Sequence, residues 1–129
     1  MRLDQQRYAG KVLRKHAEMV GSSSKKNPLP SNAMGNVLAE DTGNYSKEQS
    51  KFVREFPYRE LVGATLYLAM HTRPDIAYPV GVLSRQCKQP SLAASKLMVY
   101  LLGYIQGSTE KGIRFSGSSF DLHVFSDLD

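Results

Sequence analysis

The chain has 129 residues, of which 41% are hydrophobic and 22% are charged, and it carries a formal net charge of +5. This length fits one ordinary domain or a piece of one, and the longest apolar run, LVGATLYLAM, is far shorter than the roughly 20 residues that a membrane-spanning helix needs. A single cysteine, Cys87, excludes an internal disulfide, and the three histidines are too scattered in the sequence to form a cluster of metal ligands.

The positive charge is concentrated at the start of the chain. Residues 1–26 contain seven basic side chains and two acidic ones, so the rest of the chain is balanced. A localised basic segment suggests an anionic partner, and nucleic acid fits better than a membrane because the segment has no bulky aromatic anchors on an apolar face. The first residues also lack the apolar centre of a secretory signal, so we expect an intracellular protein, in a cytoplasmic particle or the nucleus.

Residues 5–20 show the apolar spacing of a helix, for which Asp4 is the predicted N-cap and Gly21 the predicted end. Four basic residues of this helix fall at i, i+4, i+7 and i+8 and form what we call the basic stripe: Arg7, Lys11, Arg14 and Lys15. Such a stripe either follows a phosphate backbone or is a solvated helix face, and periodicity alone favours the solvated face.

Residues 21–45 are rich in Gly, Ser, Asn and Pro and show no apolar period, which indicates a linker or an extended crossing segment. Ser46 and Gln49 have the spacing of a capping box, so a short helical turn is predicted to begin there and to stop before Pro57. From residue 58 to residue 70 the pattern is apolar around most of a helix, which predicts a buried helix.

The sequence TRPD separates this helix from the next one. Thr72 is the predicted N-cap of the second helix, Pro74 suits its first turn, and Asp75 faces its positive end. Arg73 is then expected to be free at the corner, where it either contacts phosphate or, as a structural role that we favour, bonds carbonyls of the preceding helix. Pro79 should kink the second helix or delay its start.

A third helix is predicted to begin at Pro90 and Ser91 and to end at Gly107, so that three consecutive helices share one core. Tyrosines at core spacing in these helices are expected to pack rather than to stack on bases. The sequence GIRFSGSSFDLHVF then predicts two short strands around a turn at 117–119. Because a lone hairpin is marginal in water and the pattern reaches the last residue, we expect a truncated chain.

Five stretches occur in a fixed order: LDQQRYAGKVLRKH, NPLP, YRELVGATLYLAMHTRPDIAYPVGVLSR, QPSLAASKLMVYLLGYIQGSTEKGIRFS and LHVFSDLD. In this order they resemble the Pol polyprotein of copia-type LTR retrotransposons, from the C-terminal end of reverse transcriptase to the start of RNase H. The resemblance implies a mainly α fold with a small C-terminal β element, in which a helical thumb and connection region precedes a β-hairpin that would open an RNase H fold. It implies four segments: a thumb-end helix at 1–21, a linker at 22–57, a helical connection region at 58–108, and a β element with the truncated start of RNase H at 109–129.

The resemblance also implies a function. In the full protein this region would support the template-primer duplex between the polymerase and RNase H sites, with the basic stripe and Arg73 as nucleic-acid contacts. The chain departs from the family at Ala94, where a histidine is usual, and at three positions that are usually basic: Val99, Tyr100 and Gly103. These departures remove side chains that would otherwise face a nucleic-acid backbone.

By the same resemblance, Asp127 is the first catalytic carboxylate and metal ligand of the RNase H site. Phosphoryl chemistry with two metal ions needs several converging carboxylates, and one strand cannot supply them. We therefore expect Mg²⁺ for the full-length enzyme, no cofactor for this chain alone, and no catalysis by it. The alternative for Asp127 is a solvated residue at a frayed end.

Two further hypotheses come from other classes of function. The chain is either a decayed or co-opted element that serves as a small basic nucleic-acid-binding module, or a purely structural assembly surface. The expected partners are nucleic acid and the remainder of the polyprotein, and not a membrane.

Overall fold

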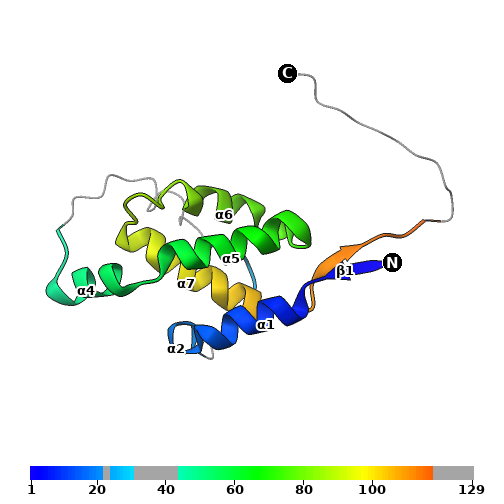
Figure 1. The fold of residues 1–129 in the computed structure, drawn as a ribbon, viewed down its shortest axis with the longest axis horizontal. Helices are drawn as coiled ribbons and strands as arrows, with labels where there is room; N and C mark the ends of the chain where they lie inside the picture. Colours follow the sequence, from blue (N-terminus) through cyan, green and yellow to red (C-terminus); the bar gives the residue numbers. More distant parts are fainter. Residues whose placement is uncertain (22–23, 31–43, 118–129) are drawn as a thin grey trace, which may run out of the picture.

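The computed structural model describes residues 1–21, 24–30 and 44–117. Figure 1 shows an elongated helical body from one end of which a narrow two-stranded ribbon projects. The elements in chain order are β1 (Arg2–Asp4), α1 (Gln6–Lys15), α2 (Ala17–Val20), α4 (Lys47–Glu55), α5 (Tyr58–His71), the 3₁₀ helix η1 (Pro74–Ile76), α6 (Ala77–Ser84), α7 (Leu92–Gln106) and β2 (Gly112–Arg114). These residues are thus mainly helical with a small sheet, and the predicted strand that contains Asp127 lies outside them.

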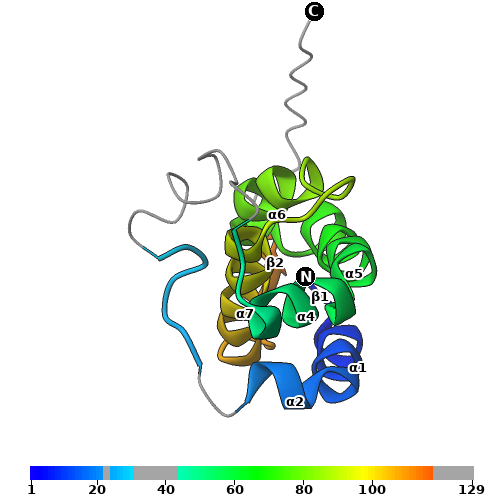
Figure 2. The ribbon, with the colours of Figure 1, turned by 90° about the vertical axis from the view of Figure 1, so that its left-hand side faces the viewer.

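The core lies where α5, η1, α6 and α7 meet, and α1 and α2, which contact α7, close it on the side opposite α6 (Figure 2). Its completely buried aliphatic side chains come from all four elements: Leu61, Ile76, Val80, Leu83, Met98, Leu101 and Leu102. Burying a side chain of this size contributes roughly 1.5–3 kcal/mol. The prediction that three consecutive helices share one core is confirmed.

The predicted N-terminal helix is interrupted. At His16 the backbone leaves the helical region, with φ −115° and ψ 26°, and this residue separates α1 from α2. The interruption turns the buried side chains of His16 and Val20 toward the body. Gly21 ends α2 with φ 65°, a left-handed conformation that glycine adopts easily, as predicted.

The predicted N-cap of α1 is wrong. Gln5 occupies the cap position and makes no side-chain cap bond, although Asp4 Oδ1 accepts from the amide of Gln6, the first residue of α1, across 3.4 Å. Asp4 belongs to β1 instead, where its carboxylate forms an ion pair with Arg2 across 3.3 Å.

The capping box of α4 is confirmed: the Ser46 hydroxyl accepts from the Gln49 amide, and the Gln49 side chain accepts from the Ser46 amide. Pro79 lies in the first turn of α6, which begins at Ala77, so the later start is the alternative that the structure takes. Ser91 caps α7 and Gly107 ends it, also as predicted.

The prediction that α5 is buried around most of its circumference is wrong for one face. Leu66 is 38% exposed, Tyr67 is 46% exposed and Met70 is 74% exposed. Apolar residue types alone did not distinguish this face from the one that packs on α6 and α7, because the hydrophobic periodicity of α5 is weak.

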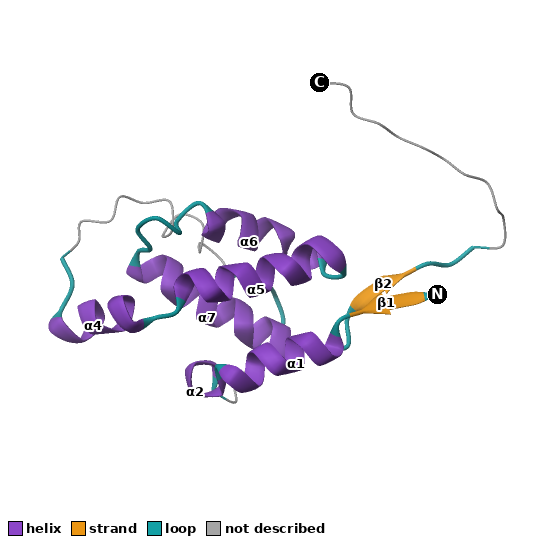
Figure 3. Cartoon of the chain, in the orientation of Figure 1, coloured by secondary structure: helices purple, strands orange, loops and turns teal. Residues whose placement is uncertain are grey.

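The sheet joins distant parts of the chain. β1 pairs antiparallel with β2, in the register Arg2↔Arg114, Leu3↔Ile113 and Asp4↔Gly112, and the two strands lie apart from the helices (Figure 3). The sequence predicts two short strands around a turn at 117–119, and the second of these strands lies outside the described residues. Gly112 is required here, because a Cβ atom at this position would collide with the carbonyl oxygen of Leu3.

Within the predicted linker, residues 24–30 form no helix or strand and lie against α7, to which the Lys25 amide donates at the Gly103 carbonyl across 3.2 Å. This agrees with an extended crossing segment. None of the helices in the described ranges is long and apolar enough to cross a membrane.

A matched pair of leucine substitutions tests the core. Leu101→Ala should lower the free energy of unfolding by roughly 2–5 kcal/mol, since it opens a cavity at a completely buried position. Leu66→Ala, the same chemical change at a 38% exposed position, should cost much less. Denaturant unfolding followed by circular dichroism measures both, and equal losses would contradict the packing described above.

Candidate nucleic-acid interface

The basic stripe lies on the outer face of α1. Its four side chains are exposed, while Ala9 is buried and Val12 and Leu13 are partly buried against the core. The alternation of apolar and basic residues at helical spacing causes this separation, because only one face of α1 can reach the core.

Three of the four cations in the stripe have no acidic partner in the part of the chain that the structure describes. Arg7, Lys11 and Arg14 form no ion pair with any residue that the structure describes. Lys15 instead pairs with Glu60 at the start of α5. The hydrogen bond from Lys15, together with the charges of Lys15 and His16, lowers the pKa of the Glu60 carboxyl.

The helix that carries these three cations, α1, is packed against the rest of the molecule. Residues four apart on a helix are about 6 Å apart along its axis, so Arg7, Lys11 and Arg14 present a row of positive charge. α1 packs against α7, which prevents the row from turning away from the surface. Such a row attracts a polyanion without reading its sequence, since Arg and Lys contacts to phosphate displace counterions.

Arg73 lies elsewhere, and it is not free. Its side chain is 2% exposed, and its Nε and Nη2 atoms donate to the two carboxylate oxygens of Asp75, each across 3.0 Å. Nη1 donates to the Ser108 carbonyl across 2.9 Å, and Nη2 also donates to the Ser108 hydroxyl. The expectation of a free Arg73 is therefore wrong, and in this structure its guanidinium offers no exposed group to a phosphate.

The favoured alternative for Arg73 is a structural role in which it bonds carbonyls at the helix junction. The structure confirms a structural role, but the side chain bonds another carbonyl than the predicted one. The carbonyl that the Arg73 guanidinium bonds belongs to Ser108, just after α7, whereas the backbone amide of Arg73 donates to the Leu68 carbonyl of the preceding helix α5 across 2.9 Å. The corner between α5 and η1 is thereby tied to the end of α7.

The same corner makes two further contacts. The Tyr104 hydroxyl donates to Asp75 Oδ2 across 2.6 Å. Burial raises the pKa of the Asp75 carboxyl, but the hydrogen bonds from Arg73 and Tyr104 and the charge of Arg73 outweigh it, so that the net shift is downward. Thr72, predicted as an N-cap, follows the end of α5 instead and donates its hydroxyl to Gln5 Oε1 across 2.7 Å.

Sequence reasoning missed Ser108 and Tyr104 as partners of Arg73 and Asp75. The distance in the chain is 35 residues for the Arg73–Ser108 contact, and no local pattern marks it. The signal that could have helped is the pairing of Tyr104 and Ser108 at i and i+4, because the Ser108 hydroxyl also donates to the Tyr104 carbonyl across 2.7 Å.

The packing prediction for the tyrosines holds for two of them. Tyr58 and Tyr104 are buried with bonded hydroxyls, and burial raises the pKa of Tyr58, which donates to the Leu83 carbonyl across 2.6 Å. Tyr78 is 65% exposed and Tyr67 is 46% exposed, so packing is wrong for Tyr78 and only partial for Tyr67, whose ring contacts Tyr8.

Metal binding by this chain stays a prediction. Within residues 1–21, 24–30 and 44–117, no three His, Cys, Asp or Glu side chains are grouped so as to hold a metal ion. Asp127 lies outside these ranges, and its role as a metal ligand stays a prediction.

The known proteins to which this chain is similar include two that are named for transposons. The chain is 31% identical over 131 residues to the retrovirus-related Pol polyprotein from transposon TNT 1-94 of Nicotiana tabacum, which covers 98% of this chain and 9% of that protein. It is 30% identical to an uncharacterized mitochondrial protein of Arabidopsis thaliana, over 98% of this chain and 48% of the relative. A protein of Saccharomyces cerevisiae named for transposon Ty5-1 is 35% identical over 55% of this chain and 23% of its own length.

The chain thus spans about half or less of each of these relatives. No family model matches it, and no solved structure matches it. The similarities support a chain derived from a copia-type transposon protein.

The hydrogen bonds that join Asp75 to Arg73 and Tyr104 should make the stability of the fold depend on pH. Asp75→Asn should remove this dependence. Because the pKa of Asp75 is lowered in the folded chain, its stabilising contribution is complete above the ordinary value of 3.8 and is lost as the pH falls through the lower folded value. The variant should lose about 1–3 kcal/mol at neutral pH, less than a fully buried pair, since the Asp75 side chain is 32% exposed.

The difference between wild type and variant should then shrink below pH 3.8 in denaturant unfolding. Glu18→Gln is the control, because Glu18 is exposed on α2 and forms no ion pair within the described ranges. A stability difference for Asp75→Asn that is independent of pH would contradict the role assigned to this carboxylate.

Proposed function

We propose that this chain is a segment of a copia-type retrotransposon polyprotein that covers the end of the reverse transcriptase, the connection region and the start of RNase H. Its role in the full protein is to support the template-primer duplex between the two active sites. The relation to a transposon Pol polyprotein over 98% of the chain supports the origin. The exposed row of Arg7, Lys11 and Arg14 on α1 is the observation that carries the binding role.

The proposed contact is electrostatic. Each phosphate that α1 neutralises releases condensed counterions from the duplex, and this release favours binding of any sequence. Phosphate contacts fix the position of the duplex and leave its bases unread, which suits a region that must accept every template. Lys15 adds less than its neighbours, because its charge is already shared with Glu60.

The proposal assigns no catalytic step to this chain alone. In the full-length enzyme, Mg²⁺ would supply the charge that phosphoryl chemistry needs, and Asp127 would be its first RNase H ligand. The further carboxylates would come from the remainder of the polyprotein, which is the second proposed partner. The whole protein would act inside the cell, in a cytoplasmic particle or the nucleus.

One observation also favours the second candidate, a small co-opted nucleic-acid-binding module. The helices between residues 44 and 117 enclose a core of their own with α1 and α2, so the described part has what a folded unit needs. Both candidates use the same face of α1, and they differ in whether a longer polyprotein is required.

Charge reversal on α1 tests the proposed interface. Lys11→Glu with Arg14→Glu should weaken binding to an RNA–DNA or DNA duplex and should lower the slope of log K against log salt by about 0.9 for each lost phosphate contact. Fluorescence anisotropy between about 50 and 200 mM salt measures the slope.

The control carries the same change in charge on another helix. Lys47→Glu with Lys51→Glu alters two exposed lysines of α4 and should leave most of the binding intact. Equal losses in the two variants would mean that net charge, and not the face of α1, governs binding.

The chain alone should show no turnover in primer extension or in cleavage of an RNA–DNA hybrid with magnesium. The physical reason is that one strand cannot supply converging carboxylates for two metal ions. Cleavage that disappears in Asp127→Ala would contradict this expectation.

A further inference from the structure

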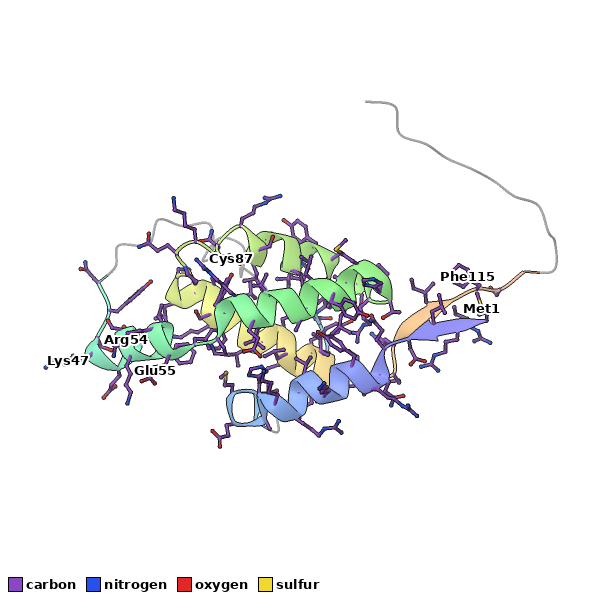
Figure 4. All side chains as sticks on the ribbon, viewed as in Figure 1. Met1, Lys47, Arg54, Glu55, Cys87 and Phe115 are labelled. Atoms are coloured by element: carbon purple, nitrogen blue, oxygen red, sulfur yellow. The ribbon has the colours of Figure 1, made fainter. Side chains whose placement is uncertain are left out.

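A second concentration of positive charge lies at the other end of the molecule from the ribbon, around a shallow hollow of about 420 Å³. The hollow is formed where α4 runs into α5 and where the chain passes from α6 to α7. Its basic side chains are Arg54 at the end of α4, Arg59 in the first turn of α5, and Lys88 after α6. Arg54 and Cys87, which also borders the hollow, are marked toward the same end of the molecule in Figure 4.

The charge of the hollow is not neutralised from within. Arg54 and Lys88 are exposed and form no ion pair with the residues that the structure describes. Among the residues that the structure describes, Glu60 is the one acid that lines the hollow, and Lys15 of the basic stripe already pairs with it. In the described lining of the hollow, three cations therefore face a single carboxylate, and that carboxylate already pairs with Lys15.

One of the three cations is held in place. Arg59 donates from Nε to the Cys87 carbonyl across 3.1 Å, which leaves the terminal nitrogens of its guanidinium without a partner in the described ranges. Phe56, Pro57 and Pro90 also line the hollow and give it an apolar wall. A fixed guanidinium beside flexible cations and an apolar wall suits a ligand with a phosphate next to a flat or sugar-like group.

The size of the hollow limits that ligand. A volume of about 420 Å³ lies within the roughly 300–1,000 Å³ typical of small-ligand pockets, which suits one or two nucleotides. A duplex would bridge the rim and could not enter, whereas the sugar and phosphate of a single strand could.

We infer that this hollow binds the phosphate backbone of a single nucleic-acid strand, through Arg54, Arg59 and Lys88. The inference rests on the proposed function for the class of ligand, and it adds a second site for a different form of that ligand. The two sites are connected through the chain of contacts from Lys15 to Glu60 and on to the neighbouring Arg59. A strand that leaves a duplex bound along α1 would thus meet the hollow at the start of α5.

The experiment compares a blunt duplex of about 16 base pairs with the same duplex carrying a single-stranded extension of about six nucleotides. Arg54→Ala with Lys88→Ala should abolish the gain in affinity that the extension gives and should leave the blunt duplex bound as before. The salt slope for the extended substrate should fall by about 1.4, since each single-strand phosphate contact contributes about 0.7. Arg59 is left unchanged, because it also supports the α6–α7 segment.

Lys47→Ala with Lys51→Ala is the matched control, because it removes the same charge from α4 at exposed positions that do not line the hollow. Thermal unfolding checks that both variants remain folded. If both substrates weaken equally, or if the control loses as much as the test variant, the hollow is not a single-strand site and the inference is overturned.

Failure of the proposed function gives a different pattern. In that case the blunt duplex does not bind wild type, and charge reversal at Lys11 and Arg14 changes nothing. A single-stranded oligonucleotide alone then tests the hollow, since its binding should still depend on Arg54 and Lys88. Absence of that dependence would overturn the inference by itself.

Discussion

The buried guanidinium of Arg73 is the constraint on which the rest of the structure depends. A charge that is 2% exposed costs several kcal/mol in lost hydration unless it is paired and hydrogen-bonded. Asp75 and Ser108 supply those bonds, and they come from different elements, one from η1 and the other from the segment just after α7. The chain can satisfy Arg73 only by bringing the α5–η1 corner onto the end of α7, so one local electrostatic requirement selects a tertiary arrangement.

That arrangement reaches both ends of the described chain. The Thr72 hydroxyl, next to Arg73, bonds Gln5 and so fixes the start of α1 against the same corner. The segment after Ser108 leads directly into β2, which pairs with β1 just before Gln5. The ribbon and the basic face of α1 are therefore positioned from one corner, although β1 and α1 lie near the start of the chain and β2 lies near the end of its described part.

Basic residues divide into two roles here, and pairing with a carboxylate decides between them. Arg73 and Lys15 are committed to Asp75 and Glu60, and they stabilise contacts between elements. Arg7, Lys11 and Arg14 on α1 keep their charge available at the surface, as do Arg54 and Lys88 around the hollow. A polyanion gains more from the second group, because each cation of the first already bonds a carboxylate and would have to give up that bond.

Features that depend on neighbours within a few residues could be predicted from the sequence. The capping box at Ser46, the end of α2 at Gly21, the limits of α7 and the amphipathic face of α1 all follow from local hydrogen bonding and helical period, and all were predicted. Only the tertiary structure decided the partners of Arg73, the exposed face of α5 and the pairing of β1 with β2. These features depend on contacts between residues far apart in the chain, and the free energy of such contacts is set by burial and geometry that no local pattern records.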